Sequence, residues 1–134
     1  MIKTRKNAYI KDLCDVISKH AKLSQNSIYE VLKNEIDSLD NDTISMSLNG
    51  EISMANFIKD KAFDRIQTAL LPTAKACVRD SKFLSAYLGL TNATPSENEL
   101  SKNFANEIFR ILEQGENNFV SEIDIKEILL NLGK

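Results

Sequence analysis

Residues 53–72 read SMANFIKDKAFDRIQTALLP, and they indicate the fold class more clearly than any other part of the chain. Apolar side chains recur here every three or four positions, which places them on one face of a helix. Ser53 stands where a helix cap is expected, and Pro72 lacks the backbone N–H that a continuing helix needs. We therefore predict a helix that is interrupted or kinked at Pro72. Its apolar face comprises Met54, Phe57, Ile58, Ala62, Ile66 and Leu70.

The chain that follows carries signals for further helices. One should end near Gly89, because glycine commonly closes a helix. Residues 94–97 read TPSE, a typical helix start. Thr94 is expected to cap this helix, Pro95 to take the first helical position and Glu97 to reach back to the cap amide. The remaining signals predict that this helix ends at Gly115 and that a last short helix runs from Ser121 to Gly133.

Helical spacing also marks the chain before residue 37. It is seen over residues 8–21, in Tyr9, Ile10, Leu13, Val16, Ile17 and Ala21. Ser24 can cap a second helix, which continues toward Ile36. Residues 37–42 read DSLDND, an acidic run rich in turn formers, and this run is the best candidate for a linker.

Residues 43–49 read TISMSLN, and their alternation of apolar and polar side chains is typical of a β-strand. The pair Asn49-Gly50 would close this strand as a turn. A lone strand needs a partner, either a neighbouring extended segment or the same strand of a second subunit. The overall prediction is a mainly α protein with one short strand near 43–49 and a C-terminal helical bundle.

Composition excludes several classes of protein. Cys14 and Cys77 lie far apart without a C-x-x-C pair, so neither a disulfide scaffold nor a zinc ribbon is expected, and both are predicted to be buried, reduced thiols. No window approaches the roughly 18 apolar residues of a membrane span, and no apolar stretch follows the basic N-terminus. We expect a cytoplasmic protein.

The formal net charge of -2 is unevenly distributed along the chain. Residues 1–33 contain seven basic and three acidic residues, a net charge of +4, whereas residues 34–134 contain ten basic and sixteen acidic residues, a net charge of -6. One end of the chain should therefore attract polyanions and the other should repel them.

The chain offers no recognisable catalytic centre. Its one histidine, His20, is expected on a helix surface, and neither cysteine has a histidine nearby in sequence. The four glycines stand singly, so no loop has the glycine density that wraps phosphates. Residues 113–124 align only loosely with a calcium-binding EF-hand loop, whose glycine and terminal glutamate are missing. We expect neither enzymatic activity nor a metal or other cofactor.

Residues 17–32 read ISKHAKLSQNSIYEVL, and this segment resembles, without a gap, the helix-turn-helix unit of the lac-type repressors and many phage regulators. The family has small residues where the two helices cross, matched here by Ser18 and Ala21, and apolar residues in the angle between them, matched by Ile28 and Val31. The sequence departs from the family at Lys22, where glycine is usual, and at Glu30, which places a negative charge on the recognition helix.

The resemblance implies a set of DNA contacts. Family members touch base edges from the start of the second helix, here Gln25, Asn26, Ser27 and Tyr29. Phosphate contacts independent of sequence would come from Lys3, Arg5, Lys6, Lys19, Lys22, Ser24 and Lys33. Ser24 would do so while capping the second helix.

These observations predict a DNA-binding transcriptional regulator. Residues 1–38 would form the helix-turn-helix head, residues 39–52 a linker with the extended segment, and residues 53–134 a helical body. Assembly of a homodimer or higher oligomer is expected through residues 43–112, because one head makes few base contacts. A weaker route to DNA is a ribbon-helix-helix, in which residues 43–49 of two subunits would pair. The alternatives are two ordinary amphipathic helices in place of the head, and a non-enzymatic protein-interaction module.

Overall fold

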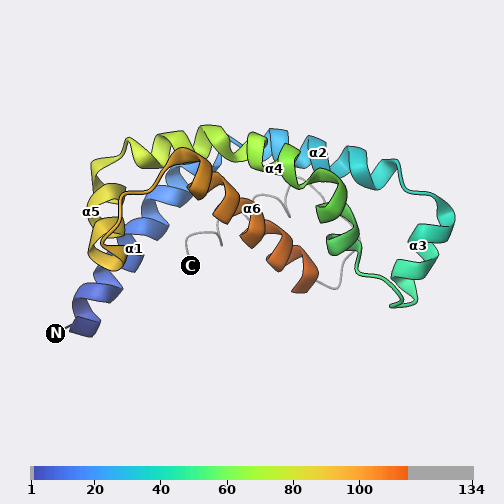
Figure 1. Ribbon diagram of the computed structural model, residues 1–134, viewed down its shortest axis with the longest axis horizontal. Coiled ribbons are helices and arrows are strands. Elements are labelled where there is room, and N and C mark those ends of the chain that lie inside the picture. The colour runs from blue at the N-terminus through green and yellow to red at the C-terminus, as the bar shows by residue number, and fades with distance from the viewer. Residues whose placement is uncertain (1, 115–134) are drawn as a thin grey trace.

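The computed structural model describes residues 2–114, with side chains from residue 5 to residue 113. This part of the chain contains helices and no strand, which confirms the mainly α prediction (Figure 1). The expected helix from Ser121 to Gly133 lies outside the described residues, as does Gly115. The helices are α1 (Ile2–Ala21), α2 (Gln25–Asp37), α3 (Asn41–Leu48), α4 (Met54–Val78), α5 (Ser81–Thr91) and α6 (Glu97–Gln114).

Helix α4 is the centre of the fold, and α2 and α6 run antiparallel to it. Along α2, Glu35 pairs with Arg65 in the middle of α4 and Ser24 bonds to Thr73 near the end of α4. Along α6, the order is likewise reversed, because Gln67 bonds to Ser101 while Asn56 bonds to Glu113. Helix α1 extends past the N-terminal end of α2 and packs on α5 and on the C-terminal end of α4.

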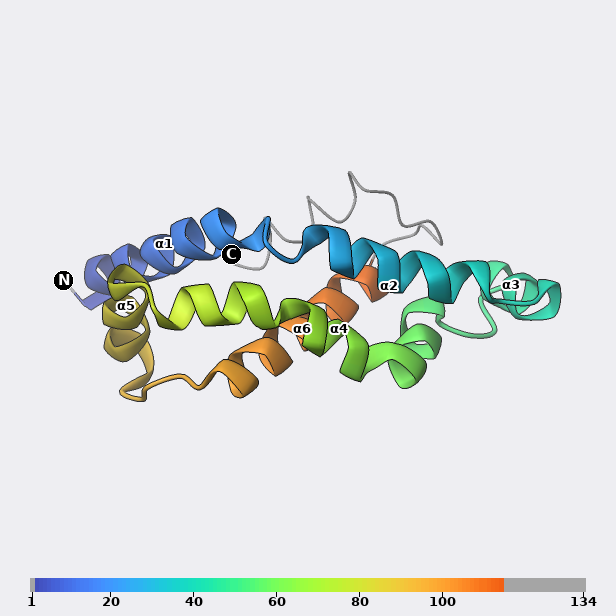
Figure 2. The same ribbon diagram turned by 90° about the horizontal axis from the view of Figure 1, so that it is seen from above.

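The resulting molecule is elongated, with α1 and α5 at one end and α3 at the other (Figures 1 and 2). One continuous core joins α1, α2, α4, α5 and α6. Its fully buried side chains include Ile28 and Leu32 of α2, Ile66 of α4 and Ile108 of α6. Residues 1–38 and the helical body, which the sequence separates into two regions, thus contribute to the same core. Within residues 2–114, no helix combines the length and the apolar character needed to cross a membrane.

Helix α4 is not interrupted at Pro72, so that form of the prediction is wrong. It continues to Val78, because Ala74 and Cys77 extend its buried face with no exposed surface. Pro72 itself lies on the exposed side, as does Thr68, whose carbonyl loses its N–H partner to the proline. The break between α4 and α5 comes instead at Asp80, whose carboxylate caps α5 by accepting a hydrogen bond from the Lys82 N–H.

The predicted strand at residues 43–49 is wrong, since residues 43–48 lie in α3 and Asn49 is its C-cap. The deciding contact is at Asp40, whose carboxylate accepts a hydrogen bond from the Thr43 N–H at 2.7 Å and so starts a helix. Alternation over seven residues is a short signal, and a strong cap overrides it. A ribbon-helix-helix needs a strand at these residues, so that hypothesis for DNA binding is also wrong.

Two predicted helix boundaries also move. Ser96, rather than Thr94, caps α6, because its hydroxyl accepts a hydrogen bond from the Glu99 N–H. Helix α5 passes through Gly89 and ends at Asn92, which adopts the left-handed conformation with a φ of 57°. Gly89 serves packing instead, since a Cβ there would lie 2.4 Å from the ring of Tyr9 on α1.

Candidate nucleic-acid interface

Helix α1 and the turn after it carry several exposed cations. Arg5, Lys6, Lys19 and Lys22, all predicted to contact phosphates, have exposed side chains. None of the four forms an ion pair within the described part of the chain. Lys3 belongs to α1 by its backbone, but its side chain lies outside the described residues. These cations are thus available to an anionic ligand.

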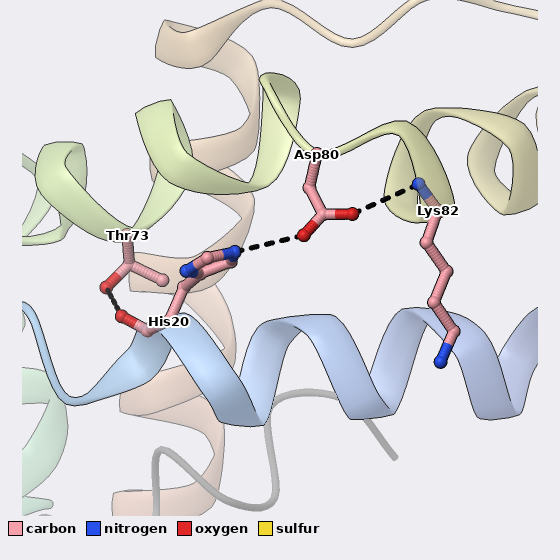
Figure 3. Close-up of polar contacts among 4 residues, drawn as sticks. All are labelled: His20, Thr73, Asp80 and Lys82. Atoms are coloured by element: carbon pink, nitrogen blue, oxygen red, sulfur yellow. Dashed lines mark hydrogen bonds and ion pairs between the residues drawn. The ribbon is translucent and has the colours of Figure 1, made fainter.

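A polar cluster fixes the end of α1 against the α4–α5 junction (Figure 3). The His20 Nε2 lies 3.2 Å from the Asp80 Oδ2. A carboxylate can only accept, so Nε2 carries the hydrogen. The His20 hydrogen bond holds the pKa of Asp80 below its ordinary value, and the backbone N–H groups of Lys82 and Phe83 act in the same direction. The positive charge of the Lys19 ammonium also lowers this pKa.

Ser24 is not available to a phosphate, contrary to the prediction. Its side chain is fully buried and makes no cap hydrogen bond, although the residue occupies the N-cap position of α2. The hydroxyl lies 2.7 Å from the Thr73 hydroxyl, which in turn donates to the His20 carbonyl at 2.9 Å. Thr73 has one hydrogen to donate, so Ser24 is the donor in the first bond. Ser24 therefore anchors the α1–α2 turn to α4.

Helices α1 and α2 do not pack extensively against each other. The two helices follow one another along the molecule (Figure 2), and their main packing partners are α5 for α1 and α4 for α2. In a helix-turn-helix unit the two helices cross at about 90–120°. The glycine usual in the family suggests a left-handed backbone at this position, but Lys22 does not adopt it. Among the described residues, only Asn92 and Gly50 have a positive φ. Base recognition by α2 therefore rests on the sequence resemblance.

The outer face of α2 carries little positive charge. Among the predicted base-contacting residues, Asn26 and Ser27 are exposed, Gln25 is half-buried and Tyr29 packs against the core. Lys33, a predicted phosphate contact, is engaged with Asp37 at 2.9 Å. That hydrogen bond raises the pKa of Lys33. The exposed residues of this face are Asn26, Ser27, Glu30, Lys33, Asn34 and Asp37.

The fold brings further cations to the end of the molecule that contains α1. We call residues 2–22 and 71–93 the basic end, which has nine basic and three acidic residues and a formal charge of +6. Residues 23–70 and 94–114, the acidic body, have six basic and twelve acidic residues and a charge of -6. Residue-level prediction missed Lys11, Lys75 and Arg79, which are exposed at the basic end. Of these three residues, only Lys11 could have been found from the sequence, because it belongs to the positively charged segment of residues 1–33.

One cation of the basic end is already engaged. The Lys82 ammonium lies 3.5 Å from a carboxylate oxygen of Asp15 and 3.7 Å from one of Asp12, both on α1. These pairs hold α5 alongside α1 and neutralise Lys82. The cations of the basic end that remain available to an anion are therefore its other exposed lysines and arginines.

The described residues include no group of three or more His, Cys, Asp or Glu side chains arranged to hold a metal ion. Burial raises the pKa of the Cys77 thiol to about 12, with the Asp80 charge adding to the shift, so this thiol stays protonated. Cys14 is half-buried rather than buried as predicted.

A comparison with protein-family models, with curated proteins and with solved structures finds no match to this chain.

Proposed function

We propose that this protein is a regulatory DNA-binding protein that contacts the phosphate backbone through its basic end. The observation that carries the proposal is the division of charge, +6 at the basic end against -6 on the acidic body. A duplex is a dense line of negative charge, and cations that neutralise its phosphates release condensed counterions. A molecule with this charge distribution is attracted to the duplex by one end only.

The proposed contact residues are the exposed cations of the basic end that form no ion pair among the described residues. They lie on α1, in the turn after it and on the end of α4: Arg5, Lys6, Lys11, Lys19, Lys22, Lys75 and Arg79. Base recognition from the start of α2 is a second part of the proposal. Asn26 supports it, since it is exposed and follows closely on Lys22. A side-chain amide can pair with adenine through two hydrogen bonds.

The experiment is fluorescence anisotropy with a labelled duplex across a salt series. We expect Lys19→Ala and Lys22→Ala each to weaken binding to all duplexes alike and to reduce the slope of log affinity against log salt by about 1. The matched control is Lys102→Ala on α6, which removes from the acidic body an exposed lysine that has no ion pair among the described residues. Equal effects of all three substitutions would contradict contact through the basic end. If the parent protein does not bind any duplex, the protein-interaction alternative takes precedence.

A further inference from the structure

The tip of the molecule, formed by α3 and the loops on either side of it (residues 38–53), leaves apolar side chains uncovered. Met46 is 41% exposed and Leu48 is 68% exposed. Helix α3 has no extensive packing against any of the other five described helices. It projects at the end of the molecule opposite to the start of α1 (Figure 1). Residues two positions apart do not share one side of a helix, so Met46 and Leu48 leave the end of α3 apolar on more than one side. Uncovered apolar surface of this kind is typical of a surface that a partner covers.

The charge of the tip defines the chemistry of that partner. Asp42 and Glu51 are exposed and have no ion-pair partner among the described residues, and Asp40 lies beside them as the cap of α3. A second tip is a poor partner, because carboxylates would face carboxylates across a two-fold axis. The partner surface should instead be apolar at its centre and surrounded by cations.

The α1–α5 side of the basic end carries exposed apolar side chains and cations, and its carboxylates Asp12 and Asp15 are paired with Lys82. Tyr9 of α1 packs against Gly89 of α5, and the sequence neighbours of this contact, Ile10 and Leu88, are 38% and 42% exposed. The exposed cations nearest to Ile10 in the sequence are Lys6 and Lys11, on the same helix. Four of the five large apolar side chains exposed in the described region are thus divided between the tip and the α1–α5 surface.

We propose that the tip of one molecule docks on the α1–α5 surface of a second copy. Met46 and Leu48 would meet Ile10 and Leu88, and the carboxylates of the tip would face the cations of α1. The contact joins two different surfaces, so each molecule keeps one free tip and one free α1–α5 surface. Repetition of such a contact gives a ring where the rotation closes and an open chain where it does not. This inference does not depend on DNA binding.

Sedimentation velocity over a concentration series tests the proposal. The parent should form species larger than a dimer, and added salt should dissociate them because it screens the exposed charges. The tip variant Met46→Lys/Leu48→Lys and the basic-end variant Ile10→Glu/Leu88→Glu should each self-associate roughly tenfold or more weakly. The matched control is Leu23→Lys, which replaces the fifth exposed apolar residue, in the α1–α2 turn, and should assemble like the parent.

Mixing the two variants gives the decisive result. Each variant retains the surface that the other lacks, so an equimolar mixture should form a one-to-one dimer and nothing larger. A parent that stays monomeric overturns the proposal. So does a basic-end variant that still dimerises alone, because that result indicates tip-to-tip pairing. Circular dichroism checks folding, and Met46→Ser/Leu48→Ser replaces the lysine pair if helicity falls. At protein concentrations too low for assembly, the tip variant should bind DNA like the parent, which separates this test from that of the proposed function.

Discussion

Thr73 connects three helices through one hydroxyl group. It accepts a hydrogen bond from Ser24 at the start of α2 and donates one to the carbonyl of His20 at the end of α1. Both Thr73 and Ser24 are fully buried. A buried hydroxyl that loses its partner retains the full penalty of leaving water. The direction of α1 relative to α2 therefore depends on a pair of small polar residues.

A double-mutant cycle measures this connection. Ser24→Ala should lower the free energy of unfolding by about 1 kcal/mol, because it removes one hydrogen bond. Thr73→Val should lower it by about 1–3 kcal/mol, because it leaves the buried Ser24 hydroxyl without an acceptor. The His20 carbonyl keeps the hydrogen bond that it accepts from the Leu23 N–H. The double variant should lose less than the sum. Urea denaturation gives these values, with Thr68→Val, an exposed threonine of α4, as the control. Equal losses in Thr73→Val and Thr68→Val would contradict a structural role for the buried pair.

Asp80 predicts a component of acid sensitivity. Its pKa is lowered in the folded protein, chiefly by the His20 hydrogen bond. A lowered carboxyl pKa stabilises the fold above the unfolded value of about 3.9, and this stabilisation is lost as the pH falls through the folded value. Asp80→Asn keeps the cap but removes the charge. The parent should therefore exceed this variant in stability at neutral pH, and the gap should close below about pH 4.

Chemical denaturation from pH 7 to pH 3 checks this dependence. Asp64→Asn, which changes an exposed carboxylate of α4 without an ion pair among the described residues, is the control. A constant gap between Asp80→Asn and the parent over this range would exclude the charge of Asp80 as the cause.

At the scale of elements, the sequence predicts helices more reliably than their ends. Residues 8–21, 24–36 and 53–70 all lie largely in helices, because apolar residues at helical spacing must be buried on one side. The errors occur where a local hydrogen bond or a tertiary contact decides. Asp40 starts a helix where alternation indicated a strand, and the core carries α4 past Pro72. Neither effect can be derived from spacing alone.

The connection between α2 and α4 should tolerate a chain break. Glu51 is exposed between α3 and α4, so a glutamate-specific protease should cut there early. The fragments 1–51 and 52–134 should nevertheless elute together in gel filtration, because α2 packs along α4 through Ile28 and Leu32. They should separate only in denaturant. Fragments that separate under native conditions would show that residues 1–38 are an independent head.

Helix α2 allows a test of base recognition. Asn26→Ala should remove a base contact worth about 1–3 kcal/mol at the preferred site and leave binding to random DNA nearly unchanged. Anisotropy on a site selected from random duplexes measures this difference, with Asn34→Ala on the same face as the control. If selection enriches no sequence, or if both variants bind like the parent, α2 is a packing element and binding depends on the basic end alone.

At the scale of the whole molecule, the positive charge gathers at one end of the elongated fold. The sequence alone reveals a basic segment, +4 over residues 1–33, but it assigns Lys33 and Glu30 to that segment although α2 belongs to the acidic body. It also gives no reason to join Lys75 and Arg79 to α1, because some fifty residues separate them and only the antiparallel return of α4 brings them to the same end. The site thus depends on topology that local patterns do not encode.

The two proposals assign two ligands to the basic end, which leads to a prediction of competition. A duplex and the tip of a second copy both require the cations of α1, so one molecule should not hold both at this surface. By linkage, a ligand that binds the free surface draws the protein out of its assemblies. Adding a short duplex should therefore dissolve the large species, leaving complexes with one protein molecule per binding site. Sedimentation velocity with absorbance at two wavelengths measures this composition, with the tip variant and duplex as the reference for an unassembled complex. Complexes in which the duplex carries chains of protein would show that the two ligands occupy separate surfaces.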